Sequence, residues 1–267
     1  MRAVLGIDAA WTPGRPSGVA LAVQMGTAWR LLALSASYQR FHNLAGRGSP
    51  AELRPSGSRP DAKELLATSR KLCGAPVDLV AIDMPLARGR IAGRRASDNA
   101  LSSAYGAFKC GTHTPSGARP GPMSDELKEG FDEAGYPLQT SSISTPGVIE
   151  VYPHPALVQL ADAPERLRYK VSKVRSYWPT SDAAERRKFL LQEWAGIIAL
   201  LETQIMGVTD ALPSLPADAR GHELKAFEDM LDAVVCAWVA ICALEARATP
   251  FGDQNSAIWV PNARASH

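Results

Sequence analysis

Three aspartates stand beside apolar segments that are far apart in the chain. Asp8 follows residues 4–7, Asp83 follows residues 77–82, and Asp232 lies within the apolar run 231–244. Burying a carboxylate without a counter-charge is costly, and carboxylates that share a dry site repel one another, which raises their pKa values. A divalent cation relieves both costs, and Mg²⁺ takes oxygen ligands of this kind. If the three acids converge, they predict a site for Mg²⁺ or Mn²⁺ that can activate water against a phosphodiester.

Two further acids extend this hypothesis. Asp229 precedes Asp232 by three residues, so both project from one helix face, and Asp229 is a fourth candidate metal ligand. Glu150 lies in a short apolar segment and is a candidate ligand or base, which makes Asp8, Asp83, Glu150 and Asp232 the candidate catalytic residues. Each acid taken alone has a structural alternative, since it can cap a helix or pair with an arginine. The functional interpretation therefore depends on Asp8, Asp83 and Asp232 lying together.

Basic and polar residues provide candidate contacts to the substrate. Arginine binds phosphate bidentately, and the chain has a cluster of four arginines, Arg88, Arg90, Arg94 and Arg95. Three further candidates follow in the chain: Asp98, His154 and Lys170. His154 could shuttle a proton near Glu150, because histidine titrates near neutral pH. Each candidate also has an ordinary structural explanation. The arginines can belong to a solvated loop, and Asp98 can pair with one of them. His154 can belong to a turn, and Lys170 can be an ordinary surface lysine.

The order of the predicted elements brings two of the acids to one place. Residues 4–7, 19–23 and 29–35 are predicted strands with short connections, which indicate an antiparallel meander. A predicted helix at 61–73 then leads to a strand at 77–82, and such a crossover makes that strand parallel to its neighbour. If the neighbour is the first strand, Asp8 and Asp83 share the carboxyl edge of the sheet, where open α/β sheets bind ligands.

Later segments complete an α/β pattern. Helices are predicted at 124–134, 182–206 and 223–248, and short strands at 148–152 and 257–260. Residues 86–124 are rich in Gly, Ser, Pro and Arg and are interpreted as an excursion from the core that is partly helical between residues 96 and 107. We expect a single domain over residues 1–267.

Short motifs in this order resemble a known family. They are Gly6-Ile7-Asp8-Ala9-Ala10, Ala81-Ile82-Asp83-Met84-Pro85-Leu86, Arg94-Arg95-Ala96-Ser97-Asp98, Glu150-Val151-Tyr152-Pro153-His154-Pro155, Asp232-Ala233 and Ile258-Trp259-Val260-Pro261. The chain is similar to the domain of unknown function 429 family, whose members are predicted nucleases. The segment 102–122 departs from the resemblance because it is long and glycine-rich.

The resemblance implies a ribonuclease H-like fold, a mixed sheet of three antiparallel strands followed by parallel strands and flanked by helices. In that superfamily the first strand and the last helix supply metal-binding carboxylates, which implies a nuclease that uses Mg²⁺ or Mn²⁺. An actin-like small-molecule kinase is an alternative on a related core, although it needs a duplicated core and glycine-rich phosphate turns. A non-catalytic binding protein, with its acids paired to arginines, is a second alternative.

Composition sets the remaining limits. The chain has 267 residues, 46% of them hydrophobic, and a formal net charge of +2, so nucleic acid as a partner requires a local basic patch. The 4 cysteines lack paired spacing, which is typical of a reducing compartment. With no signal-peptide pattern and no run long enough for a bilayer, we expect a cytoplasmic protein without a membrane partner. A homodimer is compatible with the sequence, but no motif indicates one.

Overall fold

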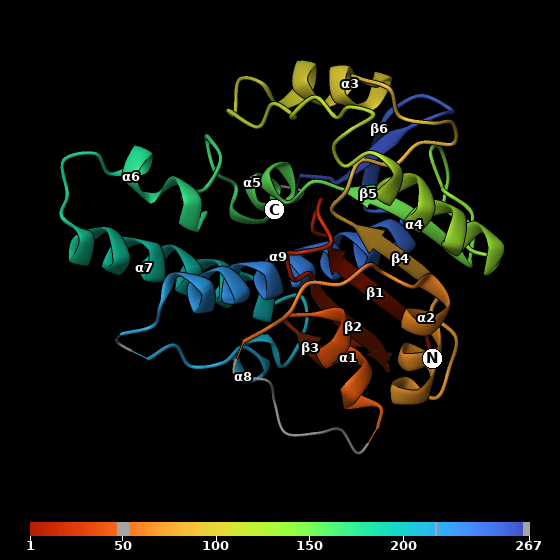
Figure 1. The fold of residues 1–267 in the computed structure, drawn as a ribbon, viewed down its shortest axis with the longest axis horizontal. Coiled ribbons are helices and arrows are strands. Elements are labelled where there is room, and N and C mark those ends of the chain that lie inside the picture. The colour runs from red at the N-terminus through yellow and green to blue at the C-terminus, as the bar shows by residue number, and fades with distance from the viewer. Residues whose placement is uncertain (47–53, 217, 264–267) are drawn as a thin grey trace.

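A computed structural model describes residues 1–46, 54–216 and 218–263. The described residues form a mixed α/β structure around a seven-stranded sheet in the order β3-β2-β1-β4-β5-β7-β6 (Figure 1). Its strands are β1 (Ala3–Asp8), β2 (Gly18–Met25), β3 (Ala28–Ser35), β4 (Leu79–Ile82), β5 (Gly147–Val151), β6 (Ala248–Gly252) and β7 (Ala257–Pro261). The predicted domain over 1–267 includes residues 47–53, 217 and 264–267, which lie outside the described ranges.

The sheet is antiparallel on one side and parallel in the middle. Strands β1, β2 and β3 pair antiparallel, as their short connections predict. Strand β4 pairs parallel to β1, with Gly6 opposite Ala81 and Ile7 opposite Ile82. Strands β5 and β7 continue the parallel part, and β6 pairs antiparallel to β7 at the edge. The carboxyl ends of β1 and β4 therefore meet at one edge of the sheet.

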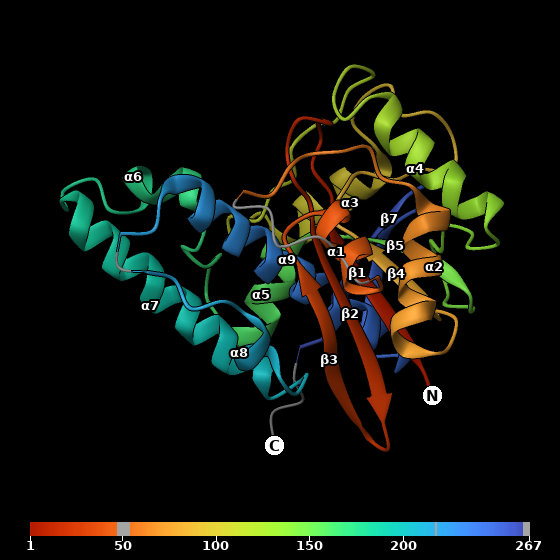
Figure 2. The ribbon, with the colours of Figure 1, turned by 60° about the horizontal axis from the view of Figure 1, so that its bottom comes forward.

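Helices cover both faces of this sheet (Figure 2). On one face lie α5, α7, α8 and α9, and on the other lie α1, α2 and α4. The helices and the 3₁₀ turn have these bounds: α1 (Tyr38–Leu44), α2 (Ala62–Cys73), α3 (Ala96–Tyr105), α4 (Pro122–Glu133), α5 (Pro153–Ala161), η1 (Val171–Lys173), α6 (Val174–Tyr177), α7 (Ala183–Glu202), α8 (Val208–Ala211) and α9 (Gly221–Leu244).

Side-chain alternation along the strands builds a core on each face. In β1, Val4 packs toward α9, whereas Leu5 and Ile7 pack toward α1, α2 and α4. The period of two follows from the pleat of a strand, which sends successive side chains to opposite faces. Because both faces are covered by helices, β4 is apolar along its whole length, and β1 is free of polar side chains up to Asp8 at its end.

Two glycines let α9 approach the sheet closely. A Cβ on Gly6 would lie 2.2 Å from the carbonyl oxygen of Ala233, and one on Gly18 would lie 1.9 Å from that of Asp229. Any side chain at either position would push α9 off β1 and β2. This close packing sets the part of α9 that carries Asp229 and Asp232 directly beside the end of β1.

The structure differs from the sequence predictions in several elements. The last helix ends at Leu244 instead of residue 248, and residues 248–252 form the edge strand β6. Residues 153–161 form α5, which was not predicted. Within the excursion at 86–124, α3 agrees with the helix predicted at 96–107, and it packs against β6 and β7. No helix in the described ranges combines the length and apolar character needed to cross a bilayer.

Candidate functional site

The structure brings four of the predicted acids together at the carboxyl edge of β1 and β4. Asp8 is the last residue of β1, and Asp83 directly follows β4, where its amide donates to the carbonyl of Ile7 at 2.8 Å. Asp229 comes from α9, and its side chain is hydrogen-bonded to that of Asp8. Asp232, one turn further along α9, is electrostatically coupled to both Asp8 and Asp83. Residues more than 200 positions apart in sequence are thus neighbours in space.

Burial and mutual repulsion raise the pKa values of these acids. Burial raises the pKa of Asp8 well above its usual range, and the charges of Asp229 and Asp232 raise it further. Burial also raises the pKa of Asp83 to about 7, with Asp232 adding to the effect although Lys170 opposes it. A hydrogen bond between two carboxyl groups requires a proton on one of them. The Asp8–Asp229 contact is therefore a place where a proton or a cation is retained.

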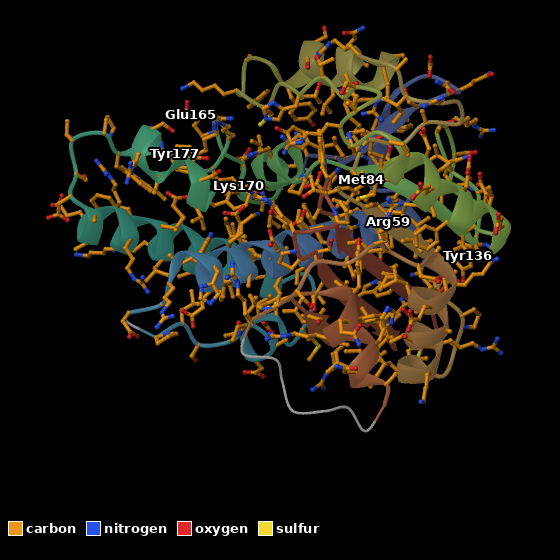
Figure 3. All side chains as sticks on the ribbon, viewed as in Figure 1. Arg59, Met84, Tyr136, Glu165, Lys170 and Tyr177 are labelled. Carbon is orange, nitrogen blue, oxygen red and sulfur yellow. The ribbon has the colours of Figure 1, made fainter. Side chains whose placement is uncertain are left out.

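Two lysines partly neutralise the acids. Lys225 contacts Asp229 and donates to Glu228 at 2.7 Å. Lys170 contacts Asp232 and lies 3.7 Å from Glu228, on the side of the molecule toward α6 (Figure 3). Burial opposes the charge of each lysine, but the surrounding carboxylates outweigh it and raise both pKa values. Both ammonium groups therefore stay charged at neutral pH.

Asp232 and Glu228 are the most firmly held acids. The side chain of Asp232 is completely buried, and it accepts a hydrogen bond from the Tyr169 hydroxyl at 2.8 Å in addition to the Lys170 contact. Glu228 accepts from the Val171 amide at 2.5 Å. The cluster contains five carboxyl groups (Asp8, Asp83, Glu228, Asp229 and Asp232) and two ammonium groups, so three carboxyl groups have no ammonium counterpart within it.

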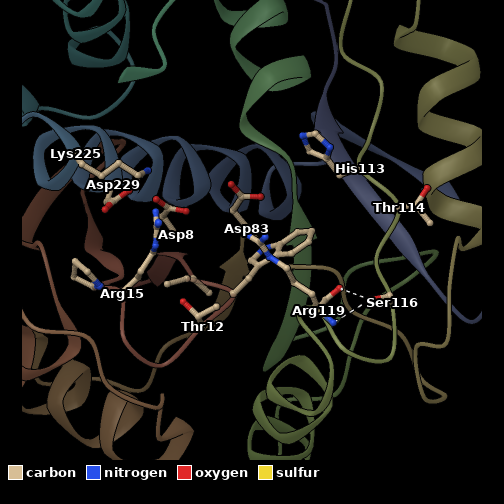
Figure 4. Close-up of a pocket in the computed structure, with 14 residues that line it drawn as sticks. Asp8, Thr12, Arg15, Asp83, His113, Thr114, Ser116, Arg119, Lys225 and Asp229 are labelled. Carbon is tan, nitrogen blue, oxygen red and sulfur yellow. Dashed lines mark hydrogen bonds and ion pairs between the residues drawn. The ribbon is translucent and has the colours of Figure 1, made fainter. Parts of the chain in front are cut away.

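A cavity of about 570 Å³ opens beside the acids. Asp8, Asp83, Asp229 and Lys225 line it next to α9, and His113, Thr114, Ser116 and Arg119 line it from the loop that precedes α4 (Figure 4). The segment after β1 contributes Trp11, Thr12 and Arg15. Neither Arg15 nor Arg119 has a carboxylate partner among the described residues, and both are exposed. Acidic and unpaired basic groups thus face the same space.

Glu150 lies near Asp83 but is held in a buried ion-pair network. It is 3% exposed, and both of its oxygens accept from the Arg95 guanidinium, at 2.5 and 2.7 Å. Arg95 also donates to Asp98 at 2.9 Å, so this Arg95–Asp98 contact matches the structural alternative for Asp98. Glu150 accepts from the amide of Leu86 at 2.7 Å, and Arg95 donates to the carbonyl of Leu86 at 2.7 Å. The network therefore clamps the turn that follows Asp83.

The other predicted arginines are not drawn into the cavity. The side chain of Arg88 reaches the carbonyl of Leu138 at 3.5 Å, and Arg88 and Arg90 line a separate groove of about 280 Å³ next to α4. Arg94 donates to Asn99 at 2.6 Å and to Ser102 at 2.8 Å. Arg95 and Glu150 instead line a small space of about 60 Å³ that also touches Asp83 and His113. The structure thus assigns local partners to Arg88, Arg94 and Arg95.

His154 is buried behind the acids. Its ring packs edge-on between the rings of Tyr152 and Tyr169, with centroids 5.4 and 5.3 Å away. Burial lowers its pKa well below the usual range, and the nearby charge of Lys170 lowers it further, so the imidazole is neutral. Its Nδ1 has no hydrogen-bond partner in the part of the chain that the structure describes. His154 is connected to the acid cluster indirectly: its ring packs against Tyr169, and the hydroxyl of Tyr169 donates to Asp232.

Several cavity residues were not singled out from the sequence. Lys225 had a usable signal, because it precedes Glu228 and Asp229 by three and four residues, the spacing of neighbours on a helix. Trp11 and Arg15 lie in the turn directly after the strand that ends at Asp8. Arg119 has no such signal, because a long segment folds back to place it there.

The donor set fits a hard divalent cation by its chemistry. Carboxylate oxygens are the ligands that Mg²⁺ and Mn²⁺ take, and a cation would relieve the repulsion that raises the pKa of Asp8. Within the described ranges no group of three or more His, Cys, Asp or Glu side chains is already arranged to hold a metal ion. Lys225 contacts Asp229 directly, and its side chain is 42% exposed.

Comparison with protein families assigns the chain to one of them. Residues 6–256 match the family described as "protein of unknown function (DUF429)", and the chain belongs to this family. The matched region runs from β1 to just before β7, so it includes the acids and the cavity residues. The sequence matches no curated protein.

Proposed function

We propose that this protein is a metal-dependent nuclease or phosphodiesterase with a ribonuclease H-like fold. The strand order β3-β2-β1-β4-β5, antiparallel and then parallel, supports the fold proposal. The observation that carries the function is the meeting of Asp8, Asp83 and Asp229 with unpaired guanidinium groups in one cavity. Negative groups suit a divalent cation, and guanidinium groups suit the phosphates of a substrate.

Asp8, Asp83, Asp229 and Asp232 would hold Mg²⁺ or Mn²⁺. The bound ion would lower the pKa of a water molecule and stabilise the leaving oxygen of the phosphodiester. Arg15 would contact a phosphate group of the substrate from the turn after β1. Lys170 and Tyr169 hold Asp232 in place, and the Arg95–Glu150 network holds the turn after Asp83.

Hydrolysis of a panel of DNA and RNA molecules with Mg²⁺ or Mn²⁺ tests this proposal. We expect cleavage that EDTA abolishes and that both Asp8→Asn and Asp232→Asn remove. Asp210→Asn, in the exposed start of α8, is the matched control and should keep full activity. Activity that survives Asp8→Asn and Asp232→Asn would exclude these residues from the mechanism.

A non-catalytic binding protein is a second candidate, because Lys170 and Lys225 already neutralise part of the acid cluster. On that account the lysines are permanent partners and no divalent cation binds. Calorimetric titration with Mn²⁺ separates the two functions. Heat of binding that disappears in Asp8→Asn supports the metal-dependent enzyme, and the absence of binding in the wild type supports the binding protein.

A further inference from the structure

The cavity beside the acids has the dimensions of a small-ligand pocket. Its volume of about 570 Å³ lies within the range of about 300–1,000 Å³ typical of sites that enclose small molecules. A DNA duplex is stiff and carries its phosphates on the outside, so bringing an interior phosphodiester into a pocket requires deformation of the helix. An unpaired nucleotide needs no such deformation, because its base is already out of the stack.

Trp11 provides a surface on which a base can stack. The residue is half-buried and packs against the core on the side of the sheet that α1, α2 and α4 cover. The guanidinium of Arg119 lies over this ring, 5.8 Å from its centroid. Unpaired bases stack on aromatic rings and on guanidinium planes, and every base offers a face for this contact. Trp11 and Arg119 therefore form a platform that does not depend on base identity.

The cavity is lined by groups of both charges. Arg15 lies in the same turn as Trp11 and is exposed, without a carboxylate partner among the described residues. Asp8 and Asp83 lie on the α9 side of the cavity (Figure 4). A nucleotide within a strand offers a matching group to each part of the cavity. Its base can stack on Trp11 and Arg119, one phosphate can bind Arg15, and the adjoining phosphodiester can reach the acids.

We propose that this cavity receives one unpaired nucleotide of a single-stranded nucleic acid or of a chain end, with its base on Trp11 and Arg119. This inference rests on the proposed function and names the substrate class of the same site. Arg15 binds a phosphate of that nucleotide, and the adjoining phosphodiester lies against Asp8 and Asp83. The interior of a duplex would have to be deformed to bring a phosphodiester into this pocket.

Binding to the Asp8→Asn variant tests the inference without catalysis. Calorimetry compares a short thymidylate oligomer with a blunt-ended duplex of the same length. We expect the oligomer to bind more tightly, and Trp11→Ala to weaken its binding by roughly 5- to 150-fold, the range that one base–aromatic stack contributes. Trp11→Phe should keep most of the affinity. Trp178→Ala is the matched control, because Trp178 is also half-buried but lines a different groove.

Hydrolysis distinguishes failure of this inference from failure of the proposed function. With Mn²⁺, Trp11→Ala should raise KM for the p-nitrophenyl ester of thymidylate and leave KM for methyl p-nitrophenyl phosphate, which has no base, unchanged. Equal cleavage of closed circular duplex and single strand, without any effect of Trp11→Ala, overturns the inference and leaves the nuclease proposal standing. Binding that depends on Trp11 without hydrolysis of any ester supports the nucleotide site and contradicts the nuclease. Absence of both binding and hydrolysis contradicts both.

Discussion

Replacing Asp83 by asparagine should stabilise the metal-free protein, and the gain should grow as the pH rises. Burial raises the pKa of Asp83 from 3.8 to about 7. Between these two values the folded protein retains a proton that the unfolded chain releases, so the free energy of unfolding falls as the pH increases. The penalty begins above the pKa of the unfolded chain and is complete above the pKa of the folded protein. Asparagine has nearly the same shape and does not titrate, so it removes this penalty.

The size of the effect follows from the difference in pKa. One pKa unit corresponds to about 1.4 kcal/mol, so the interval from 3.8 to about 7 corresponds to on the order of 4 kcal/mol. About two pH units of this interval lie above pH 5, which corresponds to about 3 kcal/mol. Asp83 is half-buried, and water screens part of the interaction. We therefore expect the advantage of Asp83→Asn over the wild type to grow by about 1–3 kcal/mol from pH 5 to pH 8.

Urea unfolding at the two pH values, with EDTA present, measures this difference. Asp210→Asn changes an exposed aspartate and should shift the free energy of unfolding equally at both. An advantage of Asp83→Asn over the wild type that is equal at pH 5 and pH 8, or that shrinks as the pH rises, would contradict the raised pKa of Asp83.

Four further substitutions test the packing and the ion pairs. Gly6→Ala should lower the free energy of unfolding by at least about 3 kcal/mol or prevent folding, because its Cβ would collide with α9; circular dichroism during urea unfolding measures this, and a neutral effect contradicts the close packing. Gly196→Ala, on the exposed face of α7 with open space around it, should instead raise stability by about 0.5–1 kcal/mol in the same assay, and a loss would contradict its exposed position. Arg95→Lys keeps the charge but loses the bidentate contact to Glu150, so we expect a loss of about 1–3 kcal/mol by urea unfolding, and an unchanged value would show that the network is dispensable. Lys170→Met leaves buried acids without their partner and should cost about 3–5 kcal/mol, part of which Mn²⁺ should restore in thermal denaturation; an unaltered Tm would contradict the pairing.

The central fold could be predicted because local patterns agree with it. Alternation, short connections and one crossover place β1, β2, β3 and β4 in the order that the structure shows. The edge strand β6 was harder to predict. After Leu244 the chain turns through Ala246, which has a positive φ of 55°. This position carries no glycine to mark the end of the helix, so the prediction extended the helix into β6.

Helix α5 was missed for a different reason. Its first residues, Pro153, His154 and Pro155, were interpreted as a turn, yet proline is favoured in the first turn of a helix because its missing amide has no partner there. The sequence Ala156-Leu157-Val158 that follows is too short and too uniformly apolar to show a helical period.

In the candidate site, the sequence pointed to the acids more readily than to their partners. Asp8 and Asp83 are recognisable because each ends a buried strand. The partners come from long segments whose paths are set by tertiary packing, as for Lys170 before η1 and Arg119 before α4. Glu150 shows the limit of the pattern, since it also lies in a buried strand but pairs with Arg95 instead of joining the cluster.

The location of bound Mn²⁺ in a crystal is the most direct measurement of the account. After a soak in Mn²⁺, anomalous scattering should show the ion among Asp8, Asp83 and Asp229, with the ammonium group of Lys225 moved away from Asp229. A crystal in which Lys225 keeps its contact and no anomalous peak lies among these acids would contradict the proposal that they form a metal site.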